Sequence, residues 1–141
     1  MAISGEQLRQ VSLFADLERR ELEALANSFK EVRFRPGDEI VSEDRGGVGF
    51  FIIAEGSARV TIRGREVAKF GPGDHFGEVA LIDEGARTAT VTAETDVRCN
   101  GLTSWAFRPL VEHNPSIAWK LLKIMARRLR ETQERQHADV A

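Results

Sequence analysis

Residues 76–91 read FGEVALIDEGARTATV and carry the most informative pattern of this sequence. This stretch follows the turn sequence at residues 71–74 and places an acidic residue, small residues and an arginine within an apolar run. Residues 77–81 predict one short helical turn inside a β-rich region, and Arg87 begins the next predicted strand. Small residues in such a turn leave backbone N–H groups accessible, which favours binding of an anion.

The two charged positions of this stretch have complementary chemistry. Arg87 supplies a fixed positive charge and a planar set of donors that suits a phosphate. The ionised carboxylate of Glu78 only accepts hydrogen bonds, so it can bind hydroxyl groups. A guanidinium for a phosphate, a carboxylate for ribose hydroxyls and amides for phosphate oxygens together describe a nucleotide site. The structural alternative is a salt bridge between Glu78 and Arg87 that joins the turn to the strand.

The chain on either side of this stretch changes its periodicity twice. Residues 32–103 contain short β-rich runs separated by Gly, Pro and Asp, a pattern typical of an antiparallel sandwich or barrel. Residues 1–31 and 104–136 instead carry apolar residues at helical spacing. Within the first of these regions, Asp16 is predicted to cap a second helix that begins at Leu17.

Turn residues and faces of the last helix can also be read from the sequence. Arg63-Gly64 predicts a tight hairpin turn, and Asn114-Pro115 predicts the start of a long helix. A heptad seam suited to pairing with a second helix comprises Ala118, Leu122, Met125, Leu129, Thr132 and Gln136. The adjacent face, expected to rest on the β-rich region or to close over a base, comprises Ile117, Leu121, Ile124 and Arg128. The alternative is one broad apolar face that packs within the chain.

Composition restricts the class of protein. A length of 141 residues with 42% hydrophobic residues predicts a single domain, 1–141, with its own core. The net charge of -2 and the pI near 6.0 predict no general attraction to nucleic acid or to anionic membranes. The single cysteine, Cys99, predicts a small buried hydrophobe. No window approaches about 18 apolar residues and no secretory signal is present, so we expect a cytoplasmic protein.

The same residues resemble the cyclic-nucleotide-binding domain family, which occurs in catabolite activator proteins, kinase regulatory subunits and cyclic-nucleotide-gated channels. The family's phosphate-binding cassette runs Phe-Gly-Glu, a short apolar helix, an acidic loop and then Arg-(Ser/Thr/Ala)-Ala-x-Val, and residues 76–91 fill each fixed position. The resemblance implies a mainly β fold, a double-stranded β-helix (jelly-roll) or β-roll. It also implies an N-terminal helical segment, a short cassette helix and a long C-terminal helix. The protein would then be a stand-alone domain of this family.

The resemblance also implies the ligand and its contacts. The ligand would be cAMP, with cGMP as the second candidate, and no other cofactor is expected. In the implied site Glu78 binds the ribose 2′-hydroxyl, Gly77 lets the ribose approach and Arg87 pairs with the cyclic phosphate. The implied ligand-binding residues are Phe76, Gly77, Glu78, Val79, Ala80, Arg87, Thr88 and Ala89. The sequence MARRLRETQERQ resembles the dimer helix of a catabolite activator protein, and the implied contacts to the base are Arg128, Thr132 and Gln133.

These features predict a sensor that signals through its C-terminal helix to an unknown effector protein and that pairs through this helix into a homodimer. We expect no direct DNA binding and no membrane partner. One alternative is a cupin-like enzyme, which needs clustered metal ligands, but the three histidines, His75, His113 and His137, are isolated in sequence. No catalytic residue and no metal site are therefore predicted. Another alternative is a degenerate β-roll that has lost its ligand.

Overall fold

The computed structural model describes residues 3–43, 45, 49–83 and 87–140, with the backbone alone for 138–140. The helices are α1 (Gly5–Arg9), the 3₁₀ helix η1 (Ser12–Phe14), α2 (Arg19–Ala26), α3 (Ala80–Asp83), α4 (Ser104–His113) and α5 (Pro115–Val140). The strands are β1 (Lys30–Phe34), β2 (Glu39–Val41), β3 (Gly49–Glu55), β4 (Ala58–Ile62), β5 (Arg65–Phe70), β6 (His75–Phe76), β7 (Thr90–Ala93) and β8 (Val97–Thr103).

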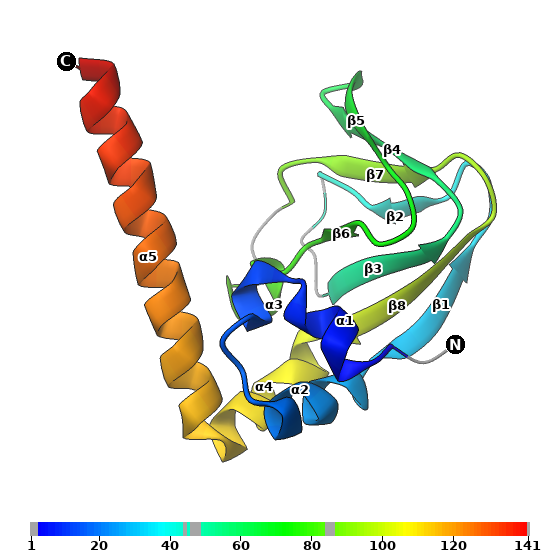
Figure 1. Ribbon diagram of the computed structural model, residues 1–141. Helices are drawn as coiled ribbons and strands as arrows, with labels where there is room; N and C mark the ends of the chain where they lie inside the picture. Colours follow the sequence, from blue (N-terminus) through cyan, green and yellow to red (C-terminus); the bar gives the residue numbers. More distant parts are fainter. Residues whose placement is uncertain (1–2, 44, 46–48, 84–86, 141) are drawn as a thin grey trace.

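The strands form two four-stranded antiparallel sheets that face each other. Their orders are β1-β8-β3-β6 and β2-β7-β4-β5, so strands distant in sequence lie side by side (Figure 1). The β4–β5 hairpin closes through Arg63 and Gly64, both with positive φ, as a two-residue turn with the twist of the strands requires. The predicted hairpin and the predicted mainly β fold with flanking helices are confirmed.

Strand β3 separates two hydrophobic cores. Its sequence GFFIIAE is apolar on both faces, as expected for a strand covered on both sides. Phe50 packs into the helix-side core with residues of α1, α2, α4 and α5, whereas Ile53 packs into the roll core between the sheets. Cys99 is buried in the roll core, as predicted, and burial raises the pKa of its thiol to about 11.

The N-terminal helices differ from the prediction. Helix α2 begins at Arg19, and its N-cap is Glu18, which forms a capping box with Glu21. The prediction of Asp16 as the cap was wrong. The carboxylates of Glu18 and Glu21 instead accept hydrogen bonds from the backbone N–H groups at the start of the helix. Strand β1 then starts at Lys30, slightly before the expected β region.

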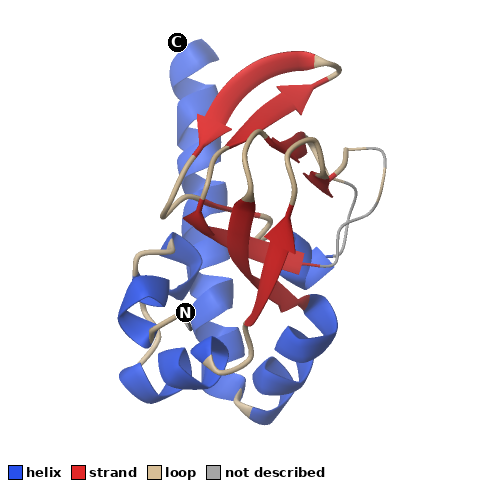
Figure 2. Cartoon of the chain, turned by 90° about the vertical axis from the view of Figure 1, so that its right-hand side faces the viewer, coloured by secondary structure: helices blue, strands red, loops and turns tan. Residues whose placement is uncertain are grey.

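The long helix α5 begins at Pro115, as predicted, and continues to Val140, past the expected end at Gln136. Figures 1 and 2 show α5 running along one side of the molecule, with the sheets and the shorter helices beside it. Ile117, Leu121 and Ile124 are buried in the helix-side core, whereas Leu122 and Leu129 are each 60% exposed. The predicted separation of two faces is confirmed only in part, because Met125 of the predicted seam also packs against the helix-side core. The buried face itself packs mainly on other helices, with Phe50 of β3 in the same core.

A buried carboxylate fixes the first turns of α5 to α2. Glu21 accepts hydrogen bonds from Ser116 Oγ at 2.7 Å and from Lys120 Nζ at 2.7 Å. Burial alone would raise the pKa of Glu21, but hydrogen bonds from Lys120, the Glu18 amide and Ser116 outweigh this effect and lower it. The N-terminal turns of α5 are therefore fixed to α2, far along the helix from its C-terminal turns.

Candidate functional site

A hollow of about 330 Å³ lies where β6, α3 and the start of β7 meet β2. We call it the cassette hollow. It is lined by Val41, Phe76, Gly77, Glu78, Val79, Ala80, Asp83, Arg87, Thr88, Ala89 and Val91. The structure therefore brings all eight residues predicted from the cassette to one place.

Phe76 fixes the position of the cassette on the roll. Its ring stacks on Phe51 with centroids 5.6 Å apart and on Phe70 at the same centroid distance. These contacts join β3, β5 and β6, so Phe76 anchors the floor of the hollow. Its stacked position suits a packing role better than a polar contact to a ligand.

Gly77 is required by its backbone and by its neighbours. Its φ is +91°, a value that favours glycine. A Cβ atom at this position would lie 2.2 Å from Arg87 Nη1 and 2.6 Å from the Gly49 carbonyl oxygen. No side chain fits between the turn and the guanidinium, so the glycine allows the close approach that the site needs.

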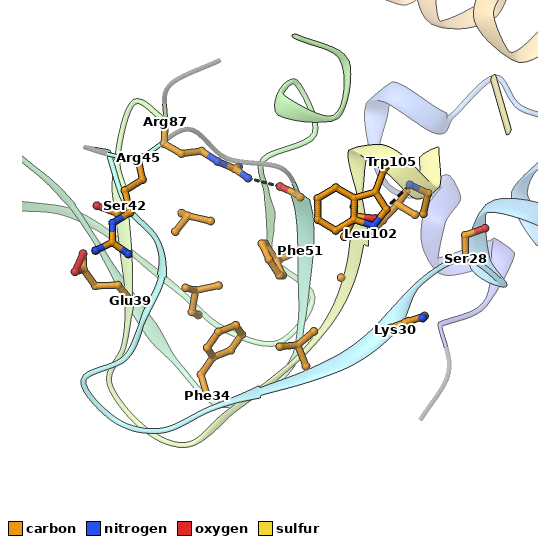
Figure 3. Close-up of a pocket in the computed structure, with 17 residues that line it drawn as sticks. Ser28, Lys30, Phe34, Glu39, Ser42, Arg45, Phe51, Arg87, Leu102 and Trp105 are labelled. Carbon is orange, nitrogen blue, oxygen red and sulfur yellow. Dashed lines mark hydrogen bonds between the residues drawn. The ribbon is translucent and has the colours of Figure 1, made fainter. Parts of the chain in front are cut away.

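Arg87 presents a half-buried guanidinium without a carboxylate partner among the described residues (Figure 3). Its Nη2 donates to the Gly49 carbonyl at 2.5 Å. Its Nε is buried and has no hydrogen-bond partner within the described part of the chain. Burial lowers the pKa of Arg87, but a guanidinium remains protonated at neutral pH. A buried charge left in this state favours a bound anion.

Glu78 lies beside two basic side chains. Its Oε2 is 3.8 Å from His75 Nδ1, and its Oε1 is 3.9 Å from Arg128 Nη1. The neighbouring imidazole of His75, with help from Arg128 and against the effect of burial, lowers the pKa of Glu78. Arg87 is not an ion-pair partner of Glu78 in the described structure. The alternative of a simple salt bridge between these two residues is therefore wrong.

The three candidate base contacts on α5 are placed differently. Arg128 reaches the cassette through Glu78 and also donates a hydrogen bond to Ser12 Oγ of η1. Thr132 is exposed, and its hydroxyl donates to the Arg128 carbonyl one turn earlier. Gln133 is exposed. Neither Thr132 nor Gln133 is among the described residues that line the cassette hollow.

Sequence reasoning missed two neighbours of the cassette. Val41 lines the hollow because β2 pairs with β7, which places Val41 opposite Val91. Gly49 supplies the carbonyl that holds Arg87. Neither residue belongs to a local motif, and both reach the site through strand pairing between distant segments.

No group of three or more His, Cys, Asp or Glu side chains is arranged to hold a metal ion among residues 3–43, 45, 49–83 and 87–140. Within the same ranges no helix has the length and apolar character needed to cross a membrane.

The chain is similar to known regulatory proteins. Residues 31–114 match the family model for the cyclic nucleotide-binding domain. A CRP-like cAMP-activated global transcriptional regulator of Mycobacterium tuberculosis (strain ATCC 25618 / H37Rv) is 33% identical over 132 residues, which is 90% of this chain and 59% of the regulator. A cAMP-dependent protein kinase regulatory subunit of Yarrowia lipolytica is 34% identical over 112 residues, 75% of this chain and 30% of the subunit.

The fold is also shared with a solved structure. The N-terminal domain of a transcriptional regulator from Streptomyces coelicolor A3(2) superimposes with a TM-score of 0.80 at 35% identity, covering 91% of this chain and 92% of that domain. The chain thus spans 59% and 30% of the two curated relatives, less than two thirds of each, but 92% of this domain.

Proposed function

Because the chain belongs to the cyclic nucleotide-binding domain family, we propose that it is a sensor module whose ligand is cAMP, with cGMP as the second candidate. Both curated relatives are named for a response to cAMP, which supports this choice of ligand. The observation that carries the proposal is the guanidinium of Arg87, whose buried Nε is without a partner among the described residues at the edge of the cassette hollow.

The cyclic phosphate is assigned to Arg87. An anion in the hollow relieves the cost of a half-buried positive charge and accepts from Nε. Gly77 leaves room for this guanidinium to lie directly against the cassette turn. Further donors are the backbone of Val79 and the amide or hydroxyl of Thr88, which is exposed at the rim of the hollow. The Ala80 amide already donates to the Gly77 carbonyl at 3.1 Å, so it is a weaker candidate donor to the phosphate than Val79 or Thr88.

The ribose is assigned to Glu78. Its lowered pKa keeps the carboxylate ionised, and an ionised carboxylate accepts from the ribose 2′-hydroxyl. Ala89 and Phe76 complete the wall and the floor of the hollow. The hydroxyl of Thr88 can also serve the amino group of a syn guanine, which is why cGMP stays the second candidate.

The signal is proposed to leave through α5. Arg128 contacts Glu78 and Ser12, so a ribose that binds Glu78 changes the contacts of Arg128. The Glu21 anchor holds the base of α5 at Ser116 and Lys120, so we expect the movement to occur beyond this point. A ligand shifts such an equilibrium only by its different affinity for the two states. Thr132 and Gln133 remain proposed base contacts in the ligand-bound state.

We propose that α5 also pairs with the α5 helix of a second copy. Leu122 and Leu129 of the predicted seam are each 60% exposed, and a second helix would cover them. The proposed location is the cytoplasm. Since the relatives are regulators, we propose no catalytic activity. We also propose that the effector is a protein partner and that the described residues make no direct contact with DNA, which the net charge of -2 supports.

Calorimetric titration tests the proposal. We expect one cAMP to bind per chain and cGMP to bind more weakly. The non-cyclic nucleotide 5′-AMP is the matched control ligand, because its phosphate is placed differently. Absence of heat and of thermal stabilisation with cAMP and with cGMP at millimolar concentration would refute the proposal.

A further inference from the structure

A second and larger cavity lies between the two sheets (Figure 3). We call it the roll chamber. Its volume is about 740 Å³, within the range of about 300–1,000 Å³ that small-molecule sites occupy. Its walls come from β1, β2, β3, β8 and the first turn of α4. Among the residues that the structure describes, it shares Val41 and Arg87 with the cassette hollow, so the two cavities meet at the guanidinium.

The floor of the chamber is apolar and incompletely covered. Val32, Phe34, Val41 and Phe51 line it and are only half-buried, although they point between the sheets. Phe34 and Phe51 meet edge to face with ring centroids 6.3 Å apart. Trp105, at the edge of the chamber, is 66% exposed. Such a lining favours an aromatic or similarly apolar body.

The charged residues of the chamber are mainly basic. Among the described residues, Lys30, Arg45 and Arg87 line it, and Glu39 contributes the one carboxylate. Lys30 and Arg45 have no ion-pair partner among the described residues. Arg87 adds the buried Nε described above. An anion of opposite charge is therefore complementary to this cavity, since unpaired charges near apolar walls attract counter-charge.

We propose that the roll chamber binds an amphipathic organic anion, an aromatic body that carries one carboxylate or sulfonate, and that this anion competes with the cyclic nucleotide for Arg87. The aromatic body packs on Phe34 and Phe51, and the charged group lies at the end formed by Arg45 and Arg87. The site goes beyond the proposed function, because its ligand is not a nucleotide.

Two matched dyes test the chemistry on the full chain. The probe is 8-anilinonaphthalene-1-sulfonate, and its uncharged counterpart is N-phenyl-1-naphthylamine. We expect saturable binding of one sulfonate dye per chain, and about tenfold or more weaker binding of the uncharged dye, as expected for loss of a hydrogen bond to a charged group. Equal affinity for the two dyes would overturn the assignment of an anion.

Paired substitutions on β1 test the location. Val32→Trp fills the chamber, whereas Arg33→Trp adds the same ring at the next residue, which is exposed and points to the opposite face of the strand. We expect Val32→Trp to abolish dye binding and Arg33→Trp to leave it within about twofold of the parent, well under the tenfold that a lost contact costs. Circular dichroism confirms that both variants are folded.

An apolar groove of about 500 Å³ between α3, α4 and α5 is the competing location for the dye. Leu122→Glu places a charge in this groove and leaves the chamber unchanged. Dye binding that is lost in Leu122→Glu and kept in Val32→Trp would overturn the proposal.

The role of Arg87 is tested without nucleotide and with it. Arg87→Gln should weaken the sulfonate dye about tenfold while leaving the uncharged dye unchanged. Added cAMP should raise the apparent Kd of the sulfonate dye. If cAMP binds in calorimetry but does not displace the dye, the proposal that both ligands bind the Arg87 guanidinium is wrong. If cAMP does not bind at all, the proposed function fails while the two dyes and the variants still test the chamber.

Discussion

Replacing Arg87 by Lys isolates the geometry of the proposed phosphate contact, because the charge is kept and the planar set of donors is lost. Lysine lacks an equivalent of the buried Nε and cannot also maintain the hydrogen bond to the Gly49 carbonyl. Disturbing one member of a buried charge pair costs about 2–5 kcal/mol, so Arg87→Lys should weaken cAMP binding roughly 30-fold to several thousandfold.

Calorimetric titration of the parent and the variant measures this change, with Arg59→Lys as the control. Arg59 is an exposed arginine on β4 that does not line the cassette hollow. We expect the control to bind cAMP with the parent's affinity and both variants to unfold cooperatively. An Arg87→Lys variant that binds cAMP within about threefold of the parent, a change of under 1 kcal/mol, would refute the placement of the phosphate.

Four other predictions follow from single contacts. Gly77→Ala should abolish cAMP binding and lower the free energy of unfolding by more than the control Gly37→Ala does. Gly37 has the same φ of +91° but open space around it, so its replacement should cost about 1–2 kcal/mol. Equal costs for the two variants in thermal melts would contradict the clash at Gly77. Glu78→Gln should weaken cAMP binding less than Arg87→Lys in the same titration, because an amide oxygen still accepts from a hydroxyl. Glu21→Gln should destabilise the fold by about 1–2 kcal/mol at neutral pH. Because folding lowers the pKa of Glu21, its stabilising contribution is present above the unfolded pKa and is lost as pH falls through the folded value. The difference in free energy of unfolding between parent and variant, measured with denaturant, should therefore vanish well below about pH 4. A difference that stays constant with pH would contradict the role of Glu21 as an anchor. Hydrogen exchange over residues 117–133 should change with cAMP beyond the Glu21 anchor, and identical protection would mean that α5 does not carry the signal.

The parts of the fold that could be predicted depend on local patterns. The hairpin at Arg63-Gly64 and the helix start at Pro115 follow from backbone preferences of single residues, and both are present. The buried face of α5 follows from helical periodicity. The start of α2 was misplaced because several acidic residues lie close together there, and which of them caps the helix depends on Glu21, whose other partners are on α5.

The candidate site shows the same division. Cassette residues such as Glu78 and Arg87 lie within one short segment, so their sequence spacing places them together at the hollow. Val41 and the Gly49 carbonyl enter through pairing of distant strands, and local sequence carries no signal for either. His75 beside Glu78 was read only as an isolated histidine, although a spacing of three residues before the carboxylate brings the two side chains together.

The most direct test of the account is an experimental structure of the protein with cAMP. We predict the nucleotide in the cassette hollow, with a phosphate oxygen within hydrogen-bonding distance of Arg87, the ribose 2′-hydroxyl on Glu78, and Arg128 moved from its present contacts with Glu78 and Ser12. A nucleotide whose phosphate lies away from Arg87, or one bound in the roll chamber, would contradict the account.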